Sequence, residues 1–327
     1  MPNATTEIIR IDTALLRSPP FKLEPVVRIG TGRTGETDEF GPVAGIAVDA
    51  IGRIFVSDPM SARVRVYNPS GEYARDLGRR GRGPGEFCCL HGERDSRALN
   101  GIALSGDTLF ALDENLVGLD TTGAYLFASP PNGRFTEAFG IAAAQGKLVI
   151  VRSSTSASDE FRYVFSEFDL TSQIDRPGVV FREQRVDFAN KGFLYRKPSP
   201  LPLLPLTLGP DGRIYVAQGD SFHVAVIGAN GTVERSYVAP VPRVRATAQD
   251  LEAVGEDLQR LLANHVGVVD PPDIVEMIES GPRWEFRQAI GALVVSNRGA
   301  MLLQRTDISE SPFNRFAPGP GVVWLMI

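Results

Sequence analysis

The sequence predicts an all-β protein, a β-propeller built from four-stranded antiparallel sheets, or blades. The stretch Gly45–Asp58 holds two short apolar runs around a polar break at Asp49 and Gly52. This pattern is typical of two strands joined by a tight turn. Two further runs, Val64–Tyr67 and Tyr73–Leu77, complete a meander of the size of one blade.

The double run then recurs, which is the second observation that predicts a propeller. The further copies lie at residues 100–113, 139–151, 206–217 and 292–304. Each copy has a turn glycine, and these are Gly52, Gly106, Gly146, Gly212 and Gly299. The recurrence predicts radial repetition, and the irregular spacing predicts insertions between blades. We therefore predict one propeller domain over residues 1–327, with five recognisable blades.

The two ends of the chain predict how the blades close into a ring. Residues 7–11 alternate as a strand does, and Val26–Ile29 resembles the outermost strand of a blade. We expect the first part of the chain to supply an outermost strand to the last blade. The fifth blade stops at Ile327, in its third strand. Either the early strand completes that blade, or a sixth blade is missing.

Two glycine-rich segments look functional at first sight. Gly30–Gly35 matches G-x-G-x-x-G, but no helix follows it, so the dinucleotide-binding interpretation fails. Gly78–Phe87 contains several arginines and, with Arg75, predicts a local basic spot. We interpret it as a solvated loop, and the alternative is an anion or RNA site.

A helical insertion is predicted between the fourth and fifth blades, over residues 245–282. Thr247–His265 has an apolar stripe at helical spacing, and Pro271–Ile278 is a shorter helix that ends before Gly281. We expect the insertion to cover one end of the blades as a lid or plug. The alternative is a helix that binds a partner.

Composition excludes some partners. The chain has 327 residues, 43% of them hydrophobic, and a net charge of −5, so nucleic acid is not the expected partner. No apolar run is long enough to span a membrane. Cys88 and Cys89 are adjacent and predict two free thiols. Residues 1–20 contain no signal peptide, which predicts a cytoplasmic protein if this start is native.

Residues 26–87 resemble the six-bladed β-propellers of the NHL-repeat type, in a bacterial and mostly uncharacterised envelope branch. The residues that carry the resemblance are 44–58, 63–71 and 78–87. The resemblance implies six blades and a periplasmic or cell-envelope location. Proteins of this architecture include lactonases, strictosidine-synthase-like enzymes, an amidating lyase and binding domains, so it does not imply one activity.

The enzymatic relatives hold a metal in the central channel, with ligands from the innermost strands. Here those strands begin near Ala44, Asn100, Glu137 and Arg287. Asn100 and Glu137 are the weak metal candidates, for calcium or zinc. The candidate ligand-binding residues are Asn100, Glu137, Arg287, His223 and Arg63. Asp58, Arg63, Asp113 and Asp220 follow second strands, and we expect them to tie loops to the backbone.

No recognised catalytic arrangement occurs in the sequence. The histidines His91, His223 and His265 are scattered, and no H-x-H, H-E-x-x-H, C-x-x-C or G-x-S-x-G motif is present. The leading hypothesis is a non-catalytic scaffold without a cofactor, which binds an unknown protein or small molecule at one mouth of the ring. The alternative is a metal-dependent lactonase-like hydrolase or lyase that uses the central channel.

Overall fold

The computed structural model forms five β-sheets from twenty strands in its described residues. These residues are 6–12, 26–30, 43–59, 61–87, 99–113, 115–129, 138–144, 147–155, 161–169, 174–182, 206–209, 211–217, 221–228, 232–245, 247, 289–296, 298–305 and 323–326. The predicted helical insertion lies outside them from residue 248 onward.

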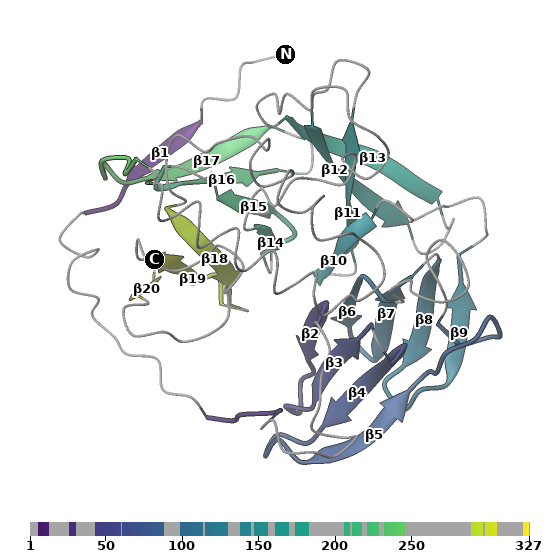
Figure 1. The fold of residues 1–327 in the computed structure, drawn as a ribbon. Coiled ribbons are helices and arrows are strands. Elements are labelled where there is room, and N and C mark those ends of the chain that lie inside the picture. Colours follow the sequence, from purple (N-terminus) through teal and green to yellow (C-terminus); the bar gives the residue numbers. More distant parts are fainter. Residues whose placement is uncertain are drawn as a thin grey trace. The chain divides into compact units, whose positions relative to one another are not determined.

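Three four-stranded antiparallel sheets, blades one to three, belong to one compact unit, residues 24–156 and 161–183 (Figure 1). Blade one consists of β2 (Gly45–Val48), β3 (Ile54–Asp58), β4 (Arg63–Tyr67) and β5 (Tyr73–Leu77). Blade two consists of β6 (Gly101–Ser105), β7 (Thr108–Leu112), β8 (Leu116–Asp120) and β9 (Tyr125–Ala128). Blade three consists of β10 (Ala138–Ala144), β11 (Lys147–Thr155), β12 (Phe161–Asp169) and β13 (Ile174–Arg182).

The second compact unit, residues 1–23, 157–160 and 184–327, contains the remaining two sheets. Blade four consists of β14 (Leu206–Leu208), β15 (Ile214–Ala217), β16 (His223–Ile227) and β17 (Val233–Val238). Blade five consists of β18 (Ile290–Val295), β19 (Met301–Arg305) and β20 (Val323–Met326). All five predicted blades are therefore present as sheets, and apart from β1, which joins the sheet of blade four, the strands of each sheet follow chain order.

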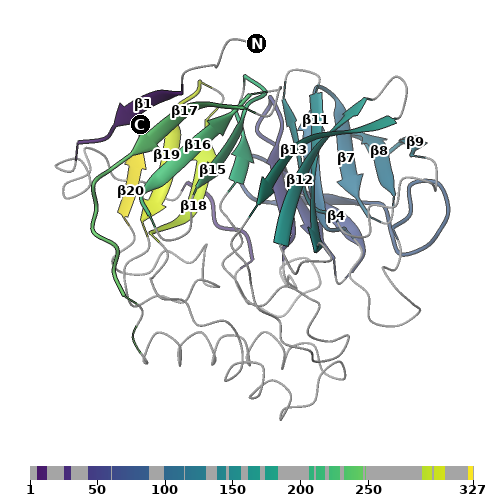
Figure 2. The same ribbon diagram turned by 90° about the horizontal axis from the view of Figure 1, so that it is seen from above.

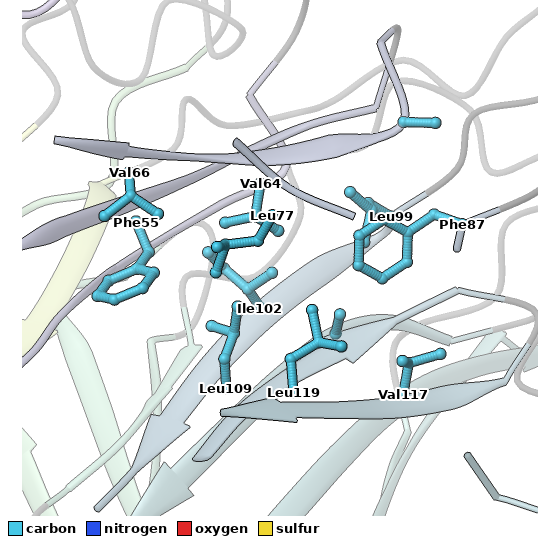
Figure 3. Close-up of a cluster of buried hydrophobic side chains, with 12 residues drawn as sticks. Phe55, Val64, Val66, Leu77, Phe87, Leu99, Ile102, Leu109, Val117 and Leu119 are labelled. Atoms are coloured by element: carbon cyan, nitrogen blue, oxygen red, sulfur yellow. The ribbon is translucent and has the colours of Figure 1, made fainter. Parts of the chain in front are cut away.

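The hydrophobic core lies between neighbouring blades, where alternate side chains of the strands meet. Between blades one and two, a buried cluster joins Phe55 and Leu77 to Ile102, Leu109 and Leu119 (Figure 3). A second cluster joins the other face of blade two to blade three, and a third joins blade four to blade five. The period of two in each strand thus buries both faces of an inner blade.

The prediction about the first part of the chain is wrong in two respects. Strand β1 (Glu7–Arg10) pairs with β17 of blade four and not with the last blade. Val26–Ile29 is not a strand. A Cβ added to Gly71 would lie 2.5 Å from the Val27 side chain, so this segment runs along the β4–β5 turn of blade one. The prediction failed because the apolar side chains of Val27 and Ile29 lie beside Gly71 of this turn, and alternation in the sequence does not show such a contact.

Candidate functional site

Each sheet has two ends with different connections. The antiparallel order places the first-to-second and third-to-fourth strand connections at one end, here the turn end. These connections are short, as at residues 49–53 and 209–213. The other end, the connection end, carries the links between blades, which include residues 78–100, 183–205 and 239–289. Long connections therefore leave each sheet from one end only.

The turn ends share one hydrogen-bond pattern. In the β2–β3 turn, the N–H of Asp49 donates to the carbonyl of Arg53 at 3.1 Å, and the N–H of Gly52 donates back to the carbonyl of Asp49 at 3.1 Å. The turns that start at Asn68, Asp120, Gly209 and Ser296 repeat both bonds. The fourth residue of such a turn has a left-handed backbone conformation, which glycine adopts without strain. In the turn that starts at Asp49 this residue is Gly52, with a φ of 84°.

Carboxylates hold several of these turns. Asp49 accepts hydrogen bonds from the N–H groups of Ile51 at 3.1 Å and Arg53 at 2.8 Å. Burial raises the pKa of Asp49, but the hydrogen bonds from the Arg53 side chain and backbone outweigh it and leave the pKa below its usual value. Hydrogen bonds from Thr122 and Ala124 likewise lower the pKa of Asp120. These carboxylates serve the backbone, as acceptors in turns commonly do.

At the connection end of blade one, two ion pairs lie on the face that points away from blade two. Asp58 and Arg65 are buried, with Oδ2 and Nη2 3.0 Å apart. The other oxygen of Asp58 accepts from the N–H of Ser61 at 3.2 Å, so this residue ties the β3–β4 loop as predicted. The second pair joins Arg63 and Asp76 at 2.6 Å and is partly exposed. The hydrogen bond to Asp76 raises the pKa of Arg63.

Two predicted ligand-binding residues, Arg63 and His223, occupy the same position in different blades. Each is the first residue of a third strand, and each bonds a side chain on the fourth strand. Arg63 bonds Asp76, and His223 Nε2 lies 3.1 Å from Ser236 Oγ. Burial lowers the pKa of His223, which favours the neutral imidazole. Both residues therefore bridge neighbouring strands within their own sheets.

The structure does not bring the described candidates together. Asn100 lies just before β6, and its N–H donates to the carbonyl of Leu112 at 2.7 Å. Arg63 lies in blade one, and His223 belongs to the other compact unit. Glu137, Arg287 and Asp220 lie outside the described residues, so their predicted roles stay predictions. Within the described part of the chain, no group of three or more His, Cys, Asp or Glu side chains could hold a metal.

The arginine-rich segment Gly78–Phe87 is an ordered loop at the connection end of blade one. Glu86 accepts from the N–H of Gly83 at 2.8 Å and from Arg79 at 2.7 Å, and these two bonds lower its pKa. Phe87 is fully buried, and its ring fills the space beside Gly78, where a Cβ would lie 2.1 Å from it. The loop is thus held at both ends by its own side chains.

The exposed charge of this loop comes from Arg79, Arg80 and Arg82. Arg75, which the sequence placed in the same basic spot, does not belong to it. Its guanidinium donates to the carbonyl of Thr121 at 2.7 Å, in the β8–β9 turn of blade two. The prediction failed because alternation places Arg75 on the face toward blade two, where a free carbonyl accepts the bond.

Sequence reasoning missed the Asp58–Arg65 pair. The sequence predicts that Asp58 ties a loop to the backbone, and it assigns no partner to Arg65. The register shows that Val56 lies opposite Arg65, two residue pairs from Asp58 and on the same face of the sheet. An Arg between two apolar residues of a predicted strand is a signal for a carboxylate nearby. The sequence contains this signal at Arg65, between Val64 and Val66.

Comparison with known proteins supports the fold class. A family model described as a six-bladed β-propeller matches residues 33–92, which include blade one and the loop that ends at Phe87. Among the described residues, no helix is long and apolar enough to cross a membrane. The predicted fold, a propeller of the six-bladed type, is confirmed, whereas its NHL character stays a prediction.

Three solved structures illustrate the similarity. A putative exported protein from Bacteroides fragilis has 13% identity and a TM-score of 0.44, with 85% of this chain and 69% of that chain covered. Virginiamycin B lyase from Staphylococcus aureus has 12% identity and a TM-score of 0.37, with 87% and 70% covered. Glutaminyl cyclase from Myxococcus xanthus has 16% identity and a TM-score of 0.35, with 79% and 83% covered. These likenesses concern the fold alone. No curated protein matches the sequence.

Proposed function

We propose that this chain is a non-catalytic scaffold that binds a protein or small-molecule ligand at the connection ends of its blades. In a closed propeller these ends form one mouth of the ring. The observation that carries the proposal is that long and short connections lie at opposite ends of the sheets. Every link between consecutive blades leaves from the connection end, while the turn ends keep short turns. Binding residues are commonly found on loops that a rigid scaffold positions.

The described charged side chains support a scaffold. Asp49, Asp120 and Asp211 hold turns, and Asp58 and Asp76 pair with arginines inside blade one. A general acid or base at neutral pH usually needs a pKa moved toward 7. The pKa values of Asp49, Asp120 and Asp211 move in the other direction. These carboxylates are suited to a structural role.

The loop Gly78–Phe87 is the described part of the connection end best prepared for a ligand. It is ordered by Glu86 and Phe87, and Arg80 and Arg82 are exposed residues of this ordered loop. A loop that is already ordered loses little conformational entropy when a ligand binds. We place the scaffold in the cell envelope on the basis of the sequence resemblance alone.

A capture experiment with matched charge reversals tests this function. Wild-type protein, the Arg80→Glu/Arg82→Glu variant and the Arg298→Glu variant are immobilised, and captured proteins and metabolites are quantified by mass spectrometry. Arg298 is an exposed residue of a turn end, so its reversal is the control. We expect ligands that the wild type and the control retain equally and that the loop variant loses by about tenfold.

Two results would contradict the proposal. The first is an identical capture profile for all three proteins, which would place binding elsewhere. The second is stoichiometric calcium or zinc in purified protein together with turnover of a lactone substrate. That result would favour the alternative, a metal-dependent lactonase-like hydrolase or lyase that uses the central channel.

A further inference from the structure

Blade four carries a fifth strand that breaks the antiparallel rule of its sheet. Strand β1 lies beside β17 at the outer edge of the blade, in both Figure 1 and Figure 2, and runs parallel to it. The register runs from Glu7 opposite Arg235 to Arg10 opposite Val238. The edge of this blade therefore binds an extended segment that lies 228 residues away from Arg235 in the chain.

Side-chain and backbone contacts define what this edge recognises. Glu7 pairs with Arg235 at 2.6 Å, and the Thr6 hydroxyl donates to the carbonyl of Val233 at 2.9 Å. Beyond the strand, the N–H of Ile11 donates to the carbonyl of Val238 at 2.8 Å. Ile11 is 6% exposed and joins the core cluster of blades four and five. The edge thus selects a carboxylate and, four residues later, an apolar side chain.

Apart from the buried Ile11 beyond its end, strand β1 keeps its side chains partly or largely exposed to solvent. Ile8 is 62% exposed, and the side chains of Glu7 and Arg235 are 57% and 43% exposed, so water screens their ion pair and it contributes little to stability. Parallel pairing is also slightly less stable per residue than antiparallel pairing. An extended peptide that makes more main-chain hydrogen bonds with β17 than the four residues of β1 can therefore compete with β1.

We propose that the outer edge of blade four is a strand-addition site for an extended peptide of a partner protein. The peptide lies parallel to β17, with an acidic residue against Arg235 and an apolar residue in the place of Ile11. Strand β1 occupies the site until such a peptide displaces it. This mode of recognition takes its affinity from main-chain hydrogen bonds and its specificity from alternate side chains. It does not depend on the function proposed for the connection ends.

A disulfide that locks β1 in place gives the decisive test. Ile9 and Tyr237 are register partners, so Ile9→Cys/Tyr237→Cys is introduced into full-length protein in which Cys88 and Cys89 are replaced by serine. The probe is a fluorescent peptide with the sequence of residues 4–13, followed by fluorescence anisotropy. We expect the reduced protein to bind the peptide and the oxidised protein to bind it at least tenfold more weakly.

Equal binding in both redox states would overturn the proposal, as would no binding to the reduced protein at millimolar peptide. A disulfide-linked dimer would also overturn it, because a second copy of the chain would then be the occupant. Mass spectrometry of the oxidised protein distinguishes these cases. It also reports whether the disulfide forms within one chain, which confirms that β1 docks as described.

A charge exchange tests the recognition of the acidic residue. In the Arg235→Glu variant, β1 and the wild-type peptide lose the same contact, so a peptide with arginine in place of Glu7 should bind this variant about tenfold more tightly than the wild-type peptide does. The control is Arg213→Glu, in the same sheet, whose side chain is 45% exposed and pairs with Asp211 and Glu234. If the control prefers the arginine peptide as much as Arg235→Glu does, the edge does not read this residue and the proposal fails.

Discussion

Blades one and two have the same strand register, but the equivalent faces of the two sheets are buried to different extents. In blade two, the face toward blade one contains Ile102 and Val117, each 5% exposed. In blade one, the corresponding residues are Ile46, which is 64% exposed, and Arg65, which is buried against Asp58. Blade two lies between two neighbours in its unit, whereas blade one is terminal among the three blades.

The comparison shows that the repeat pattern fixes pairing but not burial. Ile46 pairs with Val56 as Ile102 pairs with Ala111, so the strands are equivalent. The neighbouring blade decides whether the apolar side chain leaves water. Where this neighbour is absent from the unit, the third strand carries Arg65 in the place of an aliphatic residue, and Asp58 compensates its charge.

The largest expected effect is at the buried ion pair of blade one. Asp58→Ala removes the carboxylate that faces Arg65, and the loss should be about 3–5 kcal/mol in the free energy of unfolding. Urea unfolding measures it. The double variant Asp58→Ala/Arg65→Val copies the valine of blade two and should regain most of the loss. A single variant within about 1 kcal/mol of wild type would show that the pair is not buried in solution.

The second effect compares Ile102→Ala with Ile46→Ala in the same unfolding assay. Ile102→Ala leaves a cavity between blades one and two and should cost about 2–4 kcal/mol. Ile46→Ala removes an exposed side chain and should change stability by less than about 0.5 kcal/mol. Equal losses would mean that the face of Ile46 is covered in solution, and the comparison between the blades would no longer hold.

The smallest effect concerns the position that Arg63 and His223 share. Burial lowers the pKa of folded His223, so the unfolded chain binds the proton more tightly. The stability of wild type should therefore fall as the pH drops through the usual histidine range, near 6.5, and recover above it. His223→Gln should remove this part of the pH dependence. Thermal unfolding between pH 5 and 8 measures this dependence. If the stability of wild type and of His223→Gln changed with pH in the same way, the burial of His223 would be contradicted.

Much of the fold was predictable because local residues encode it. The turn glycines Gly52, Gly212 and Gly299 all have positive φ values, as a tight turn at each repeat requires. The fourth strand of blade three, β13, was not predicted because Pro177 interrupts its pattern. Proline is tolerated there because β13 is the edge strand of its sheet. Such tolerance depends on sheet position, which local sequence does not contain.

The candidate site was harder to predict because its relations are not local. The equivalence of Arg63 and His223 becomes visible only when the registers of two sheets are compared. The partner of β1 is equally hidden, since alternation predicts a strand at residues 7–11 but not its neighbour. The pairing of Arg75 with the Thr121 carbonyl depends on the packing of two blades. Side-chain partners across sheets therefore stay outside sequence reasoning.

The pairing of β1 with β17 also has a consequence for the order of folding. Every other pair of neighbouring strands in the described sheets is consecutive in the chain, so the pairing within each blade closes far shorter loops. The β1–β17 pair closes a loop of more than two hundred residues, and this closure has a larger entropic cost. Contacts of such separation form slowly. We therefore expect the blades to be folded before β1 docks, and blade four to be a stable sheet without it.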